Sequence, residues 1–270
     1  MQRADFNRSW TGISYGSGYE GQGCVNDEMT NYYVEFMKKH IFAYLNPPIT
    51  SKVLPMYWYL GYNVYSKSVL EVGGVILASW IVPIHENYDG LDYWCTCMFG
   101  EDNPSDPYLI PTDRALLDRR RKMILAPVLE KAVKAGNIII PEEFEVGFDH
   151  VTNLIAGLGM EDDPNYYLTR GYAGSVNTYV FNSISEPANN SYPPTNEETF
   201  IGYMHLSMYY NQARLAEVYP ADKYPFLTEK FAFVQKYLKD KYQIDLESIA
   251  NGAEDWDLPL PPIPETPDEE

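Results

Sequence analysis

The stretch MYWYLGYNVYSKSVLEVGGVILASWIVPI, residues 56–84, decides the fold class. It is rich in aromatic and β-branched residues, which favour extended strands over helices. Gly61 interrupts it early, and the pair Gly73-Gly74 predicts a turn or a bulge inside it. We therefore predict an antiparallel, β-rich region over about residues 52–100, and a second one over about residues 166–184.

Helical patterns fill most of the remaining sequence. The segment from Asp113 to Ala135 begins with a capping residue and is closed by Gly136-Asn137, as expected for a long helix. Pro127 lies inside this segment and predicts a kink, or a split of the helix after Leu125. Four or five such helices packed with the strands give an α+β fold, which we predict to be a single mixed domain.

The two ends of the sequence differ from its middle. Residues 1–24 are polar and glycine-rich, which predicts an extended N-terminal arm ahead of a globular body over residues 25–250. Residues 251–270 hold seven acidic residues, five prolines and no basic residue, which predicts an acidic, extended tail. Apolar residues within that tail suggest that it docks on a neighbouring surface.

The charge of the chain restricts its partners. Thirty-eight acidic residues against twenty basic ones give a net charge of −18 and an isoelectric point near 4.5. Such a chain repels phosphate backbones and anionic lipids, which argues against sequence-specific nucleic-acid binding and against membrane binding. An acidic surface along which DNA passes without adhering fits the same charge. With no signal peptide and no membrane-spanning run in the sequence, we expect cytoplasmic synthesis, followed by incorporation into a virion if the chain is a particle component.

Tyrosine supplies 24 of the 270 residues, and several tyrosines occur in adjacent pairs. Tyrosine is enriched at protein interfaces because its ring is apolar and its hydroxyl is polar. One basic cluster on the predicted long helix offers salt bridges to acidic surfaces. The candidate interface residues are Tyr32, Tyr33, Arg119, Arg120, Arg121, Tyr209, Tyr210, Trp256, Leu258, Leu260 and Ile263.

The sequence contains no pattern that identifies an enzyme. Three cysteines and four histidines stand without the spacing of a zinc site, and no nucleophile motif or phosphate-binding loop is present. We therefore predict no catalytic residue, no cofactor and no metal.

These features favour a non-enzymatic assembly subunit that acts through protein–protein contacts, as a homo-oligomer or with other structural subunits. A neck, connector or tail-ring component of a virus or phage particle fits that description. Two alternatives remain open. One is a glycan-active hydrolase with a carboxylate pair in an aromatic cleft, and the other is a sugar- or peptide-binding module.

Overall fold

A computed structural model describes residues 3–5, 18–24, 27–83, 86–87, 92–97 and 114–253 of the chain. Helices and strands are both present, which confirms the α+β class. The chain forms two compact units. The first comprises Met1–Phe42, Leu54–Leu117 and Trp256–Glu270, and the second comprises Ala43–Val53 and Asp118–Asp255.

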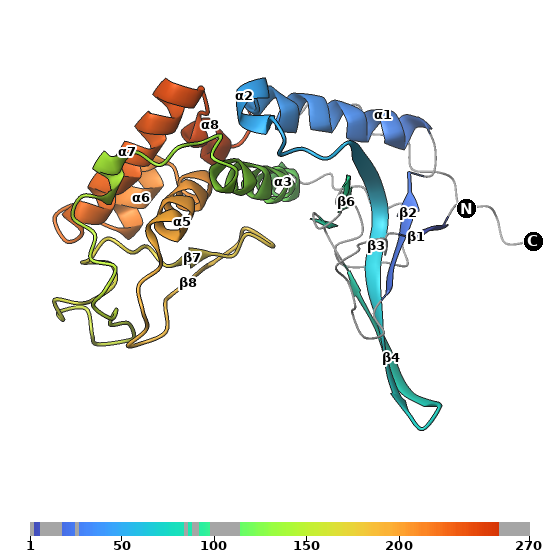
Figure 1. Cartoon of the computed structure of the whole chain (residues 1–270), viewed down its shortest axis with the longest axis horizontal. Helices are drawn as coiled ribbons and strands as arrows, with labels where there is room; N and C mark the ends of the chain where they lie inside the picture. The colour runs from blue at the N-terminus through green and yellow to red at the C-terminus, as the bar shows by residue number, and fades with distance from the viewer. Residues whose placement is uncertain are drawn as a thin grey trace, which may run out of the picture. The chain divides into compact units, whose positions relative to one another are not determined.

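A mixed sheet makes up the centre of the first unit (Figure 1). Its strands are β1 (Arg3–Asp5), β2 (Gly18–Gly23), β3 (Tyr57–Val72), β4 (Val75–Pro83), β5 (Glu86–Asn87) and β6 (Tyr93–Cys97). The order is β1-β2-β3-β6-β5, and β4 pairs with β3. The β3–β6 pair is parallel and the other pairs are antiparallel, so the expected antiparallel region contains one parallel exception.

Strand β3 is sixteen residues long and exchanges partners along its length. β2 pairs with residues 61–67 of β3, and β4 pairs with residues 65–72. The two strands β3 and β4 therefore continue beyond β1 and β2 as a two-stranded ribbon (Figure 1). Gly73 and Gly74 close the ribbon with φ values of 62° and 82°, a conformation that favours glycine in a two-residue hairpin turn.

The N-terminal segment differs from the prediction of an extended arm. The parts of it that the structure describes, residues 3–5 and 18–23, are strands β1 and β2 of the sheet. Glycine weakens a strand but does not prevent one, and the edge of β3 offers partners for the backbone of β2.

Helix α1 (Asp27–Phe36) contacts strand β6 of the sheet through Tyr33. Asp27 and Glu28 lie in its first turn, where negative charge stabilises the helix dipole. Tyr33 is fully buried, and its hydroxyl lies 2.8 Å from both the backbone oxygen and Oγ1 of Thr96 in β6. The α1 backbone continues as a π-turn (Met37–Ile41) and a 3₁₀ turn (Phe42–Tyr44).

The second unit is mainly helical. Its helices are α2 (Pro47–Thr50), α3 (Arg114–Lys134), α4 (Glu142–Glu145), α5 (Asn196–Tyr209), α6 (Gln212–Val218), α7 (Pro225–Tyr242) and α8 (Leu246–Asn251). The first four residues of α3, up to Leu117, belong to the first unit, and the rest of that helix belongs to the second. Two short strands, β7 (Ser175–Val176) and β8 (Ile184–Ser185), pair with each other. Helix α5 packs against α7, α8 and β7, and most of its residues are buried.

Helix α3 continues through Pro127 without a break, so the predicted split after Leu125 is wrong. A proline inside a helix removes one backbone hydrogen bond. Ala126 and Val128 beside it are fully buried, and this packing offsets the loss. The helix ends as expected at Gly136, whose φ is 76°.

The predicted strand region over residues 166–184 is much reduced in the structure. It contains only β7 and the first residue of β8. Gly171 and Gly174 have φ values of 80° and 78°, which turn the chain instead of extending it. The aromatic residues that suggested strands are buried in the packing of this irregular segment, as Tyr166 and Tyr167 are. Among the described residues, no helix is long and apolar enough to cross a bilayer.

Candidate ligand-binding pocket

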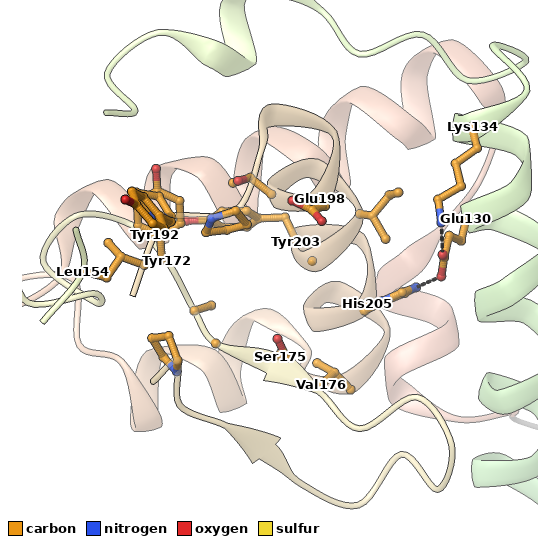
Figure 2. A pocket seen from close by; sticks show the side chains of 18 residues that line it. Glu130, Lys134, Leu154, Tyr172, Ser175, Val176, Tyr192, Glu198, Tyr203 and His205 are labelled. Atoms are coloured by element: carbon orange, nitrogen blue, oxygen red, sulfur yellow. Dashed lines mark hydrogen bonds and ion pairs between the residues drawn. The ribbon is translucent and has the colours of Figure 1, made fainter. Parts of the chain in front are cut away.

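The second unit contains a half-open pocket of about 590 Å³ (Figure 2). One side of it is formed by the last turns of α3 and by α5, and the other by β7 and the irregular segments around residues 172–174 and 187–194. A volume of this size lies within the range of small-ligand and peptide sites.

The start of α5 is fixed by its own sequence. Thr195 accepts a hydrogen bond from the backbone of Glu198, and the Glu198 carboxylate accepts hydrogen bonds from the backbone and hydroxyl of Thr195, both at 2.8 Å. This reciprocal arrangement is a capping box. The hydrogen bonds from the Thr195 backbone and hydroxyl lower the pKa of Glu198. The Glu198 carboxylate is therefore ionised, and it accepts the hydrogen bonds that cap the first turn of α5.

Gly202 lies on the face of α5 that lines the pocket. No heavy atom lies within 4 Å of the position that a Cβ would take there. Glycine in a helix interior is less stable than alanine by roughly 1 kcal/mol. At Gly202 this loss leaves open space beside the helix, where a side chain would otherwise lie. The pocket depends on this missing side chain.

His205, Glu130 and Lys134 form a charged corner of the pocket (Figure 2). Lys134 Nζ donates a hydrogen bond of 2.6 Å to Glu130 Oε1, which raises the pKa of Lys134. His205 Nε2 lies 3.9 Å from Glu130 Oε2, beyond hydrogen-bond distance. Burial lowers the pKa of His205 to about 4, although Glu130 opposes this shift, so the imidazole is neutral at pH 7.

Two of the tyrosines at the pocket have their hydroxyls engaged elsewhere. The Tyr172 hydroxyl donates to the backbone oxygen of Asp149 at 3.0 Å, and the Tyr203 hydroxyl donates to the backbone oxygen of Gly171 at 2.5 Å. Both side chains are buried, and burial raises both pKa values. Tyr192 differs, because it is 83% exposed and offers an accessible ring. The exposed residues that line the pocket are Lys134, Ser175, Tyr192 and Glu198, and the half-buried Pro187, Pro193 and Pro194 add aliphatic surface.

Strand β7 contributes the wall that faces α5 (Figure 2). Ser175 and Val176 pair with Ser185 and Ile184 of β8. Within the described part of the chain this sheet has two strands, so β7 has no second strand partner there. Gly174, just before β7, allows the close approach of β8. A Cβ added there would lie 2.5 Å from the backbone oxygen of Ser185.

The residues that the sequence marked as interface candidates lie elsewhere. Tyr32, Tyr33, Arg120 and Arg121 are at most 1% exposed, so their side chains face the interior of the chain itself. The basic cluster forms internal salt bridges, since the side chains of Arg121 and Lys122 lie 3.0 and 2.7 Å from the Asp118 carboxylate. Both cations also donate to backbone oxygens at the end of α8.

The other interface candidates remain predictions. Arg119, Tyr209 and Tyr210 are half-buried. The tail candidates Trp256, Leu258, Leu260 and Ile263 lie outside the described residues.

The sequence did not single out the pocket. Its residues come from segments up to 75 positions apart, from Glu130 to His205, and each is ordinary alone. One local signal was Gly202 in the interior of helix α5, since such a glycine often has a packing or functional reason. Among the described residues, no three His, Cys, Asp or Glu side chains are placed to hold a metal ion.

Comparisons with known proteins give little support to any family. No family model matches the sequence, and no curated protein matches it. One solved structure is similar: a putative zinc-binding metallo-peptidase from Bacteroides caccae, with 14% identity and a TM-score of 0.43. The match covers 83% of this chain and 74% of that protein.

This comparison corrects the prediction of a non-enzymatic particle subunit. The similar structure carries the description of an enzyme, and no comparison relates the chain to a virus or phage component. We withdraw that prediction. At this identity and TM-score the likeness supports no statement about the chemistry of this chain, which has to come from the pocket itself.

Proposed function

We propose that this chain is a peptide-binding module, and that its pocket holds an extended peptide segment between β7 and α5. The observation that carries the proposal is that β7, which has no second strand partner among the described residues, lies opposite a helix face opened by Gly202. An extended peptide that adds to a strand edge gains backbone hydrogen bonds, and pockets beside the edge receive its side chains.

The composition of the wall favours a peptide over a sugar. Sugar sites use exposed flat aromatic rings, and of the three tyrosines that line this pocket two, Tyr172 and Tyr203, are buried with their hydroxyls engaged, which leaves the ring of Tyr192 exposed. Pro187, Pro193 and Val176 offer aliphatic surface instead. The pocket fits a chain with apolar side chains and backbone donors and acceptors.

The carboxylates favour binding over glycan hydrolysis. A glycosidase needs one carboxyl group that stays protonated to act as the general acid. Glu198 has a lowered pKa and caps α5, and Glu130 is hydrogen-bonded to Lys134. Neither is arranged as that acid.

The charge of the pocket restricts the peptide. Glu130 and Glu198 outnumber Lys134, so acidic peptides are disfavoured and neutral or basic ones are accepted. His205 is neutral and adds no positive charge at pH 7.

Selection from a random peptide library on the wild-type chain tests this proposal. The Gly202→Phe variant fills the pocket from its floor, and Ala213→Phe is a matched control because Ala213 is exposed on α6. We expect the selected peptides to bind wild type and Ala213→Phe equally, and to bind Gly202→Phe at least about tenfold more weakly. Thermal unfolding of the three proteins checks that each is folded.

Two results would contradict the proposal. Equal binding to Gly202→Phe and wild type would place the peptide outside this pocket. Mass spectrometry of peptides incubated with the chain should show them intact, and cleavage that Gly202→Phe abolishes would make the pocket an active site.

A further inference from the structure

The hairpin end of the β3–β4 ribbon, from Val72 to Leu77, is apolar and exposed on both faces. Val72, Val75, Ile76 and Leu77 are each 60–63% exposed. Consecutive residues of a strand point to opposite faces, so Val75, Ile76 and Leu77 expose aliphatic surface on both sides. From Val72 to Pro83 the sequence contains no charged residue.

The outer edge of β4 adds unpaired backbone to this apolar surface. Among the described strands, β4 pairs with β3 alone. Natural proteins protect such edges with charged side chains, prolines or short strands. Residues 75–82 carry neither charge nor proline, and the strand is nine residues long. Among the described residues, no strand covers this edge.

A second strand covers this surface better than a lipid bilayer does. Hydrocarbon offers no hydrogen-bond partner, so an open strand edge does not enter it. A strand of another chain satisfies the backbone groups and adds cross-strand side-chain neighbours on both faces.

The sequence of this edge is compatible with a second copy of the chain, despite the acidic charge of the whole. Two chains of net charge −18 repel each other over most acidic surfaces. Residues 72–83 carry no charge, so two such strands paired side by side bring no like charges opposite each other. Two copies most often associate about a two-fold axis, and antiparallel pairing of one strand with its own copy has that symmetry.

We propose that two copies of the chain dimerise by antiparallel pairing of β4 with β4, about a two-fold axis. The sheet then continues from one copy into the other. Side chains such as Ile76 and Leu77 gain aliphatic neighbours from the partner strand, which stabilise the pair.

Light scattering on the full chain, over a hundredfold range of concentration, tests this dimer. The expected mass is twice the 31.0 kDa of one chain. Ile76→Lys and Leu77→Lys place like charges at the contact on opposite faces, and each should weaken dimerisation at least about tenfold. Val151→Lys is the matched control, because Val151 is an aliphatic residue 82% exposed in the second unit. It should dimerise as wild type does.

Circular dichroism of each variant establishes that it is folded before its mass is compared. A wild-type chain that stays monomeric over the whole range would overturn the proposal. So would dimers that persist unchanged in both lysine variants, since they must form through another surface. Co-flotation of monomers with phosphatidylcholine vesicles, lost in Ile76→Lys, would assign the ribbon to lipid and overturn the dimer.

Discussion

Lys230 Nζ donates a hydrogen bond of 2.9 Å to the backbone oxygen of Phe144 and lies 5.8 Å from the centre of the ring of that residue. It also donates to the backbone oxygen of Glu143 at 3.3 Å and lies within 5.5 Å of the rings of Phe148 and Phe226. One cation on α7 thus binds the end of α4 and the aromatic cluster of the second unit. Burial lowers the pKa of this lysine, and the two backbone oxygens and the ring faces stabilise its charge.

Replacing Lys230 by methionine should therefore destabilise the second unit. Methionine keeps most of the volume but leaves two backbone oxygens without their donor, at a cost of about 1–3 kcal/mol. Lys236→Met is the control: Lys236 is 78% exposed, and its ion pair with Asp240 on the helix surface should contribute under about 0.5 kcal/mol. Urea unfolding followed by far-ultraviolet circular dichroism measures both, and equal losses would show that the buried contacts of Lys230 contribute nothing.

Gly171 and Gly159 provide a second matched pair. Both have a φ of 80°, so alanine at either should cost about 1 kcal/mol in backbone strain. At Gly171 the added Cβ would also lie 2.5 Å from Cδ1 of Phe226, whereas at Gly159 nothing lies within 4 Å. Gly171→Ala should be the more destabilising by about 1–3 kcal/mol.

The Phe226→Leu background tests the cause of that difference. With the ring removed, the two alanine variants should differ by much less. A difference that persists in this background would assign the cost to some neighbour other than Phe226.

The sequence predicted the elements whose signal is local. The strands over residues 57–83 follow from their β-branched and aromatic residues, and the end of α3 follows from Gly136. The prediction failed where partners distant in sequence decide the structure. Gly18–Gly23 is a strand because β3 is beside it, and Tyr166 and Tyr167 are buried without forming one.

The pocket could not be predicted for the same reason. Its corner joins Glu130 and Lys134 of α3 to His205 of α5, and only the packing of the two helices brings them together. The charges of Arg120 and Arg121 suggested a surface, yet both are buried. The sequence shows that a cation is present, and the tertiary structure determines that Arg121 lies beside Asp118 and the last turn of α8.

The buried His205 should make stability depend on pH between about 6.5 and 4. Its pKa is lowered to about 4 in the folded chain, so the unfolded chain takes up the proton first as pH falls. The stabilisation is complete above pH 6.5 and is lost as pH falls toward 4. From pH 7 to pH 5 the loss should be roughly 1–2 kcal/mol.

His205→Gln isolates this contribution, because all carboxyl groups remain. Its unfolding free energy should change less between pH 7 and pH 5 than that of wild type. The lowered pKa of Glu198 affects stability only at lower pH, because that group stays ionised in both states until pH approaches its ordinary value. Parallel pH profiles for the two proteins would contradict a neutral, buried imidazole.

The last prediction concerns the first unit and the contact of Tyr33 with Thr96. Tyr33→Phe removes the hydroxyl shared by the backbone oxygen and Oγ1 of Thr96, and Thr96→Val removes Oγ1 alone. Each should destabilise the unit by about 1–2 kcal/mol, with a coupling energy of about 0.5–1.5 kcal/mol in the double mutant.

Thr96→Val also removes the 3.2 Å hydrogen bond from Trp58 Nε1, so it should cost more than the coupling energy alone. The described tryptophans, Trp58, Trp80 and Trp94, all lie in the first unit, so tryptophan fluorescence during urea unfolding follows this unit. Additive losses, with no coupling, would mean that the Tyr33 hydroxyl contacts the backbone oxygen and not the side chain.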